Sequence, residues 1–249
     1  YDANKDGEGR EDFGGKGMSI RDVLDISAYL VVGPENTLGR PVRDIVAAAV
    51  STGFTCVQIR SKTAGARELI GLTREAAAVI AAARREESVA LLVDDRLDVV
   101  LAARQQGVKV DGIHVGQSDI PPEICRQYLG KDSIVGLSAR TDALLSYVKE
   151  ADVSSIDYFG AGPLHETATK PDCGLDSNGQ IITRSLDELR ELAACSPVPV
   201  VVGGGVKLPD IQPLRETGVA GFFVVSAVAA APQPQIASQA LVQAWRDAD

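Results

Sequence analysis

Short apolar runs of strand length recur along the chain, and stretches with helical periodicity separate them. Most of these runs are rich in β-branched residues, as buried parallel strands are. The runs are 28–32, 54–59, 89–93, 110–115, 133–137, 155–159, 198–202 and 221–225. Strands that alternate with helices predict parallel pairing. Eight repeats favour a closed (β/α)8 TIM barrel in a single domain over an open doubly wound sheet.

The helical patterns lie between these runs. In 66–85, apolar residues recur with the spacing of one helix face. The stretches 97–101 and 236–245 repeat that spacing, and a further helix is expected near 185–194. The α/β alternation therefore extends over most of the chain.

Two segments depart from the alternation. Residues 1–18 are rich in glycine and charge, so we expect a flexible leader followed by the barrel domain at 19–249. Met18 is the only methionine, and the sequence leaves open whether it is an alternative start. The longest gap between strands runs from about 160 to 197. A loop of that length is often functional, with a mobile insertion as the alternative.

The amino-acid composition mainly indicates which classes of binding partner the protein does not favour. The formal net charge of −9 argues against nucleic acid or an anionic membrane as the main partner. Small anions remain compatible, because a few cations and a metal reverse the potential inside one pocket. The four cysteines lack metal-ligand spacing, which is typical of reduced thiols in a cytoplasmic protein. No apolar run approaches the ~20 residues of a transmembrane helix.

Polar residues collect where the predicted strands end, which is the face that carries active sites in a (β/α)8 barrel. Gln58, Arg60 and Lys62 close the second strand, and alternation along an extended chain puts them on one side. Two cations and an amide that face the barrel mouth suit a diphosphate. A solvated strand end is the alternative that this pattern leaves open.

Carboxylates follow the third and fourth strands. Asp94 and Asp95 come directly after the run 89–93, and Asp119 follows the fourth strand end, where His114 also lies. Asp95 and Asp119, with substrate phosphate oxygens, would make an ordinary Mg²⁺ site. The alternatives are a helix N-cap for Asp95 and a hydrogen-bonded core histidine for His114.

Hydroxyl groups and one ammonium point to phosphate contacts. Ser138 ends the fifth strand, and Thr167, Thr169 and Lys170 stand within four residues of each other. The latter three are typical of a phosphate clamp, with a threonine-rich surface loop as the alternative.

A glycine run supplies the second phosphate prediction. Gly203–Gly205 follows the seventh strand and Ser226 follows the eighth. Glycine lets backbone N–H groups approach an anion, and loops seven and eight form the recurring phosphate site of this fold. The layout therefore predicts two anion sites: a backbone cradle for one phosphate, and a metal-assisted site for a phosphate or diphosphate.

These clusters, in this order, resemble the thiamine phosphate synthase family. The matching strings, spread over roughly residues 28 to 228, are QIRSK, LLVDDRLDVVLA, VDGIHVGQSDIP, IVGLSART, DYFGAGP with TATK, VVVGGGV and FFVVSAV. The combination of HVGQSD with GP and TATK is the most specific part of the resemblance.

The resemblance implies a Mg²⁺-dependent transferase that joins hydroxymethylpyrimidine diphosphate to thiazole phosphate through a pyrimidine carbocation, with the 160–183 loop as a lid. The implied site residues are Gln58, Arg60 and Lys62 at the pyrimidine diphosphate, Asp95 and Asp119 at Mg²⁺, Ser138 and Lys170 at the pyrimidine or leaving pyrophosphate, and Thr167, Thr169 and backbone at Gly204, Gly205, Val225 and Ser226 around the thiazole phosphate. Asp94 and His114 are implied to bind substrate as well. Of these, Arg60, Ser138 and Lys170 are implied to be catalytic.

Three positions depart from the family pattern. Asp94 stands where the family usually has asparagine, Glu166 replaces a proline, and GGGV replaces IGGI. None of these changes removes a required charge. The alternatives are a thiazole tautomerase or regulatory homologue of the same fold, and a non-catalytic sensor of phosphorylated ligands. A homo-oligomer and a fusion to another thiamine-pathway domain are both left open.

Overall fold

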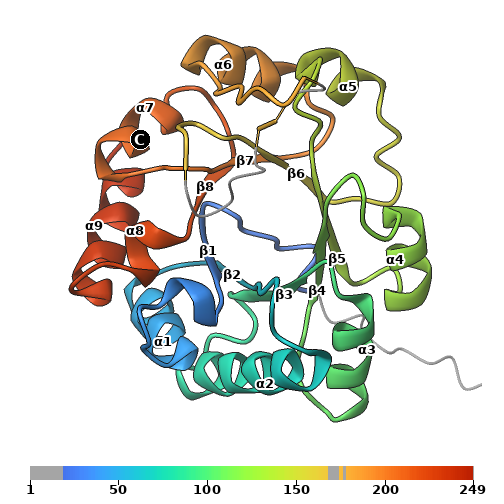
Figure 1. The fold of residues 1–249 in the computed structure, drawn as a ribbon, viewed down its shortest axis with the longest axis vertical. Coiled ribbons are helices and arrows are strands. Elements are labelled where there is room, and N and C mark those ends of the chain that lie inside the picture. Colours follow the sequence, from blue (N-terminus) through green and yellow to red (C-terminus); the bar gives the residue numbers. More distant parts are fainter. Residues whose placement is uncertain (1–18, 168–173, 176–177, 249) are drawn as a thin grey trace, which may run out of the picture.

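Eight parallel strands close into a barrel, as the sequence predicts. The computed structural model describes residues 19–167, 174–175 and 178–248. The strands follow one another around the barrel in chain order, and β8 pairs with β1 to close it (Figure 1). Their bounds are β1 Ala28–Val32, β2 Cys56–Ile59, β3 Ala90–Asp94, β4 Gly112–Val115, β5 Ile134–Ser138, β6 Tyr158–Ala161, β7 Val200–Val202 and β8 Gly221–Val224.

A ring of helices surrounds the strands (Figure 1). The α-helices are α1 Val42–Thr52, α2 Ala66–Ala82, α3 Leu97–Gln105, α4 Pro122–Leu129, α5 Leu144–Glu150, α6 Leu186–Cys195, α7 Ile211–Arg215, α8 Ser226–Ala229 and α9 Pro234–Arg246. Two short 3-10 helices, η1 Pro34–Asn36 and η2 Leu208–Asp210, precede α1 and α7.

Alternation along each strand creates two cores. In β1, Leu30 belongs to the large cluster that packs with the helices, while Tyr29 belongs to a smaller cluster inside the barrel. The small and β-branched residues of the strands fit both environments, because each strand is covered on both faces. The inner cluster fills the barrel below its mouth, so ligands have room only at the ends of the strands.

The sixth strand lies later in the chain than its apolar run predicts. The run covers 155–159, but β6 begins at Tyr158 and extends to Ala161. Ile156 is buried just before the strand, and the Asp157 carboxylate accepts a hydrogen bond from Val135 N at 2.7 Å. The apolar pattern therefore marks burial here, and the strand itself begins three residues later, at Tyr158.

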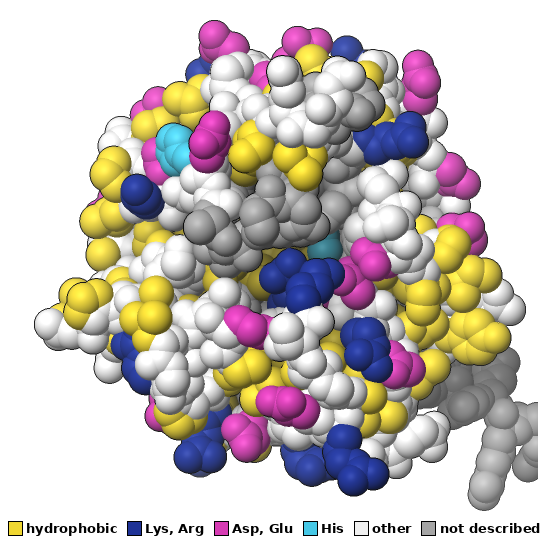
Figure 2. Space-filling view, in the orientation of Figure 1, with side chains coloured by type: hydrophobic (Ala, Val, Ile, Leu, Met, Phe, Trp, Pro, Cys, Tyr) yellow, Lys and Arg dark blue, Asp and Glu magenta, His cyan; other side chains and the backbone are white. Residues whose placement is uncertain are grey.

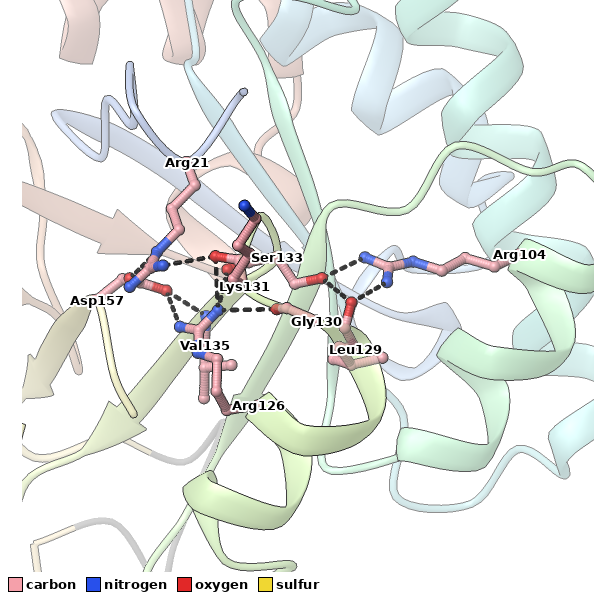
Figure 3. Close-up of polar contacts among 9 residues, drawn as sticks. All are labelled: Arg21, Arg104, Arg126, Leu129, Gly130, Lys131, Ser133, Val135 and Asp157. Carbon is pink, nitrogen blue, oxygen red and sulfur yellow. Dashed lines mark hydrogen bonds and ion pairs between the residues drawn. The ribbon is translucent and has the colours of Figure 1, made fainter. Parts of the chain in front are cut away.

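Ion pairs close the end of the barrel where the strands begin (Figure 3). Arg21 Nε lies 2.6 Å from one Asp157 oxygen, and an Arg126 nitrogen lies 2.7 Å from the other. Arg126 and Arg21 also donate to backbone carbonyls near the start of β5. Arg21 thus ties residues 19–24, which the sequence reading left without a role, to the base of the barrel.

Three sequence expectations concern features away from the barrel itself. The leader predicted at 1–18 lies outside the described residues. In the described part of the chain, Cys56, Cys125 and Cys195 are free thiols, as predicted. No helix among the described residues is long and apolar enough to cross a membrane.

Candidate functional site

A pocket opens at the carboxyl ends of the strands, with a volume of about 220 Å³. All eight strands contribute to its lining. Basic and acidic side chains lie side by side over the centre of the barrel (Figure 2). The pocket is lined by these sequence-predicted residues: Gln58, Arg60, Lys62, Asp94, Asp95, His114, Asp119, Ser138, Thr167, Gly204, Gly205, Val225 and Ser226. Thr169 and Lys170 lie outside the described residues.

The two predicted cations contact carboxylates from the neighbouring strand. Arg60 Nε lies 3.1 Å from Asp94 Oδ2, and Lys62 Nζ lies 3.7 Å from the same oxygen. Lys62 also donates directly to the Asp95 carboxylate. Burial opposes the charged form of Lys62, but the hydrogen bond to Asp95 and the charges of Asp94 and Asp95 outweigh it and raise the lysine pKa. Lys62 is therefore held as a cation at the pocket wall.

Asp95 adopts a backbone conformation that is rare outside glycine. Its φ is 57°, in the left-handed region that aspartate tolerates better than most residues. Asp95 N donates to His114 O at 2.8 Å, which ties the end of β3 to β4. The residue that precedes α3 as its N-cap is Arg96, without a side-chain cap bond, so the alternative of Asp95 as an N-cap is wrong.

Asp119 meets Asp95 across the mouth. Asp119 Oδ2 accepts from Gly116 N at 2.9 Å, and a side chain at Gly116 would place its Cβ 2.8 Å from that oxygen. Burial, followed by the adjacent Asp95 carboxylate, raises the pKa of Asp119. The pKa of Asp95 is lowered, since the hydrogen bond from Lys62 and the contact with the Asp119 carboxyl group outweigh its burial. Two carboxylates in contact create a concentration of negative charge that a cation would relieve.

Glu35 is a supporting residue that the sequence reading missed. Its carboxylate accepts hydrogen bonds from the hydroxyls of Ser61 and Thr63, the two neighbours of Lys62, and from Thr63 N. These hydrogen bonds lower the Glu35 pKa against the opposing effect of burial. Glu35 therefore fixes the backbone on both sides of Lys62. No strand pattern indicates this role, because η1 brings Glu35 in from another loop.

A chain of hydrogen bonds lies beneath the pocket, and two of its members were also missed. Gln58 Nε2 donates to the Tyr29 hydroxyl at 2.6 Å, and the Tyr29 and Tyr158 hydroxyls are 2.8 Å apart. His114 Nδ1 lies 2.9 Å from the Tyr158 hydroxyl, and His114 Nε2 lies 3.0 Å from Ser138 Oγ. We call these five residues the inner hydrogen-bond chain. In the sequence, each tyrosine belongs to an apolar run and resembles an ordinary core residue. Its hydrogen-bonding role becomes visible only when the structure places its side chain inside the barrel.

The opposite wall of the pocket is formed largely by backbone. Gly204 and Gly205 have φ values of 82° and 74°, so other residues would be strained there. Leu164 N and His165 N donate to the carbonyls of Gly203 and Gly204, both at 2.9 Å. This pairing joins the loop after β6 to the loop after β7. Helix α8 begins at Ser226, separated from the end of β8 by one residue, and Ser226 lines the same pocket.

The Asp95–Asp119 pair is the candidate metal site of the pocket. Among the described residues, no group of three or more His, Cys, Asp or Glu side chains is arranged to hold a metal ion. The Asp95–Asp119 pair offers two oxygen ligands, which suits a Mg²⁺ ion that takes its other ligands from phosphate oxygens and water.

Comparisons with known proteins agree on one family. The family model described as thiamine monophosphate synthase matches residues 28–228. A thiamine-phosphate synthase from Corynebacterium jeikeium is 38% identical over 91% of this chain and 97% of that protein. A second, from Natronomonas pharaonis, is 36% identical over 88% of this chain and 95% of its own length.

Solved structures give the same result at the level of the fold. Thiamine phosphate pyrophosphorylase from Pyrococcus furiosus superimposes with a TM-score of 0.72 and 26% identity, covering 90% of this chain and 96% of that chain. Salmonella typhimurium 3-hexulose-6-phosphate synthase gives a TM-score of 0.58 at 14% identity, over 90% of this chain and 100% of its own. The second likeness concerns the barrel alone.

Proposed function

Because this chain belongs to the thiamine monophosphate synthase family, we propose that it joins hydroxymethylpyrimidine diphosphate to thiazole phosphate and releases pyrophosphate. One observation carries the proposal. Arg60 and Lys62 share the pocket with the Asp95–Asp119 pair, and the backbone of Gly204 and Gly205 lines the same space. The first group suits a metal-bound diphosphate and the second suits a single phosphate, as two-substrate coupling requires.

In the first step, the bond between the pyrimidine methylene carbon and the diphosphate oxygen breaks, and its electron pair leaves with pyrophosphate. Arg60 and Lys62 place positive charge where this negative charge develops. The thiazole nitrogen then donates its lone pair to the carbocation and forms the new C–N bond. Holding both substrates in one pocket supplies the alignment that this second step needs.

Asp95 and Asp119 would hold the Mg²⁺ ion. Their contact and the raised pKa of Asp119 fit a divalent cation, since the ion would remove the repulsion between the two carboxylates. When bound, Mg²⁺ would neutralise diphosphate charge and act as a Lewis acid toward the leaving group.

The remaining pocket residues are proposed to bind substrate. Gln58, Asp94, His114 and Ser138 would surround the pyrimidine and its diphosphate. Thr167 and backbone at Gly204, Gly205, Val225 and Ser226 would surround the thiazole phosphate. The roles of Thr169 and Lys170, and of a lid at 160–183, stay predictions, because much of that segment lies outside the described residues.

Incubation with both substrates and Mg²⁺ tests the proposed function. We expect pyrophosphate and thiamine phosphate in equal amounts, and neither product when thiazole phosphate or Mg²⁺ is omitted. Controls with one substrate separate coupling from simple hydrolysis of the diphosphate. Failure to form thiamine phosphate under any of these conditions would overturn the proposal.

Retention of Arg60, Lys62, Asp95 and Asp119 together favours the synthase over a tautomerase or a sensor, neither of which needs a metal-bound diphosphate. Thermal unfolding with pyrophosphate distinguishes these functions. A synthase should gain stability from pyrophosphate mainly in the presence of Mg²⁺, because only the metal-bound ligand neutralises the carboxylate pair. A sensor should respond equally with and without the metal.

A further inference from the structure

The centre of the inner hydrogen-bond chain is closed to solvent. Tyr158 is 0% exposed and is absent from the pocket lining, while Tyr29 is 1% and Gln58 3% exposed. Burial raises the pKa of both phenols well above the ordinary value, so each keeps its hydrogen. Because each hydroxyl then donates a single hydrogen bond, the chain as a whole can run in only one of two directions.

The contact with Gln58 selects the direction. The Gln58 amide nitrogen donates to Tyr29, so the Tyr29 oxygen acts there as an acceptor. If Tyr158 also donated to Tyr29, the buried Tyr29 hydrogen would be left with the Cys56 sulfur, which is a weak acceptor. With Tyr29 as the donor to Tyr158, every link uses a strong donor and a strong acceptor. That arrangement avoids the cost of a poorly satisfied buried hydroxyl.

We propose that Tyr158 is a positioning residue that holds His114 as the neutral tautomer with hydrogen on Nε2. Tyr158 donates to His114 Nδ1, and His114 Nε2–H donates to Ser138 Oγ. The Ser138 oxygen is then an acceptor toward the ring, and its own hydrogen is available for an acceptor on the ligand. Only this last consequence rests on the proposed function; the tautomer is a property of the free protein.

The surrounding backbone makes room for this arrangement. A Cβ at Gly136 would lie 2.3 Å from the Tyr158 hydroxyl oxygen, and a Cβ at Gly160 would lie 3.1 Å from His114 Cε1. The His114 and Tyr158 rings stack with their centroids 5.5 Å apart. Two glycines in adjacent strands thus leave space for the ring pair that sets the tautomer.

Nitrogen NMR of the histidine rings tests the tautomer directly. The chain has two histidines, so ¹⁵N-histidine labelling gives two ring systems, and the variant His165→Asn assigns the remaining one to His114. At about pH 8, where free histidine is neutral, we expect hydrogen on Nε2 of His114 and none on Nδ1. Hydrogen on Nδ1, or on both nitrogens, would overturn the proposal.

The variant Tyr158→Phe tests the role of the hydroxyl. It should abolish the tautomer preference of His114. We also expect kcat to fall about tenfold, which corresponds to losing roughly one hydrogen bond at the transition state, while KM changes less than twofold. Tyr128→Phe is the matched control, because Tyr128 is 63% exposed on α4 and should leave both readouts unchanged.

A wild-type tautomer and rate in Tyr158→Phe would contradict the positioning role. The two proposals fail separately, since the tautomer is measured without substrate. An Nε2–H tautomer that Tyr158→Phe disrupts, in a protein that forms no thiamine phosphate, would support the positioning role and refute the proposed function.

Discussion

The two ends of the barrel use the same kinds of ionic group in opposite ways. Where the strands begin, one carboxylate, Asp157, lies between the guanidinium groups of Arg21 and Arg126. At the mouth, two cations face three carboxylates, and Asp95 and Asp119 touch each other. At the base each ionic contact joins opposite charges, whereas the mouth also brings two carboxyl groups together. We therefore expect a bound cation to be stabilised at the mouth, where like charges meet, and not at the base.

The largest effect should come from the carboxylate pair at the mouth. Asp95→Asn and Asp119→Asn each remove one proposed metal ligand, so we expect the coupling rate to fall about a thousandfold. The free energy of unfolding should stay the same or rise, because repulsion between the pair is lost. Steady-state pyrophosphate release and urea unfolding check the two parts. Wild-type rates in both variants would refute the metal assignment.

The base of the barrel should show the opposite behaviour. Asp157→Ala removes the acceptor of Arg126 Nη2 and of Val135 N in a largely buried place, and we expect a loss of about 3 kcal/mol in the free energy of unfolding. The rate per folded molecule should not change. Asp132→Ala, at an exposed neighbouring position, should alter stability by less than about 0.5 kcal/mol. If Asp157→Ala lost catalytic rate without losing stability, the base of the barrel would not have the purely structural role that we assign to it.

A smaller effect should come from the carboxylate that departs from the family pattern. Asp94→Asn removes a negative charge that contacts both Arg60 and Lys62. We expect the KM for hydroxymethylpyrimidine diphosphate to fall about fivefold, because both cations become more available to the diphosphate. The effect should weaken as salt is added. An increased KM would show instead that Asp94 is needed to orient the cations.

The smallest effect should come from the support of Lys62. Glu35→Ala removes the acceptor that Ser61 and Thr63 share, so the backbone around Lys62 should loosen. We expect the KM for the diphosphate to rise about threefold with little change in kcat. The corresponding loss of binding free energy is smaller than that of a typical hydrogen bond. Glu75→Ala, exposed on α2, is the control. Equal kinetics in the two variants would remove Glu35 from the site.

Periodicity predicted the parts of the molecule that repeat. The strand runs and their order led to the barrel, because alternation and β-branched content reflect burial on both faces of each strand. The same alternation placed Gln58, Arg60 and Lys62 together on the pocket wall, as the structure shows. At β6 burial and strand pairing separate, since Ile156 is buried without belonging to the strand.

Contacts between distant loops and strands were not predictable. Glu35 reaches Ser61 and Thr63 from another loop, and Arg21 reaches Asp157 across 136 residues of sequence. Tyr29 and Tyr158 fit the apolar pattern of their strands, so their hydroxyls gave no sign of a shared hydrogen bond. Such pairs form because the closed barrel makes residues that are distant in the sequence neighbours in space. The local spacing of residues along the chain does not indicate which ones become neighbours.

The close fit between Gly136 and Tyr158 has a consequence for the evolution of this barrel. A methyl group at position 136 would overlap the tyrosine ring, so the two positions cannot change independently. Relatives with alanine or a larger residue at position 136 are expected to carry a smaller residue at position 158. Those relatives would need another way to select the histidine tautomer. We expect them to differ in substrate preference from relatives that keep the Gly136–Tyr158 pair.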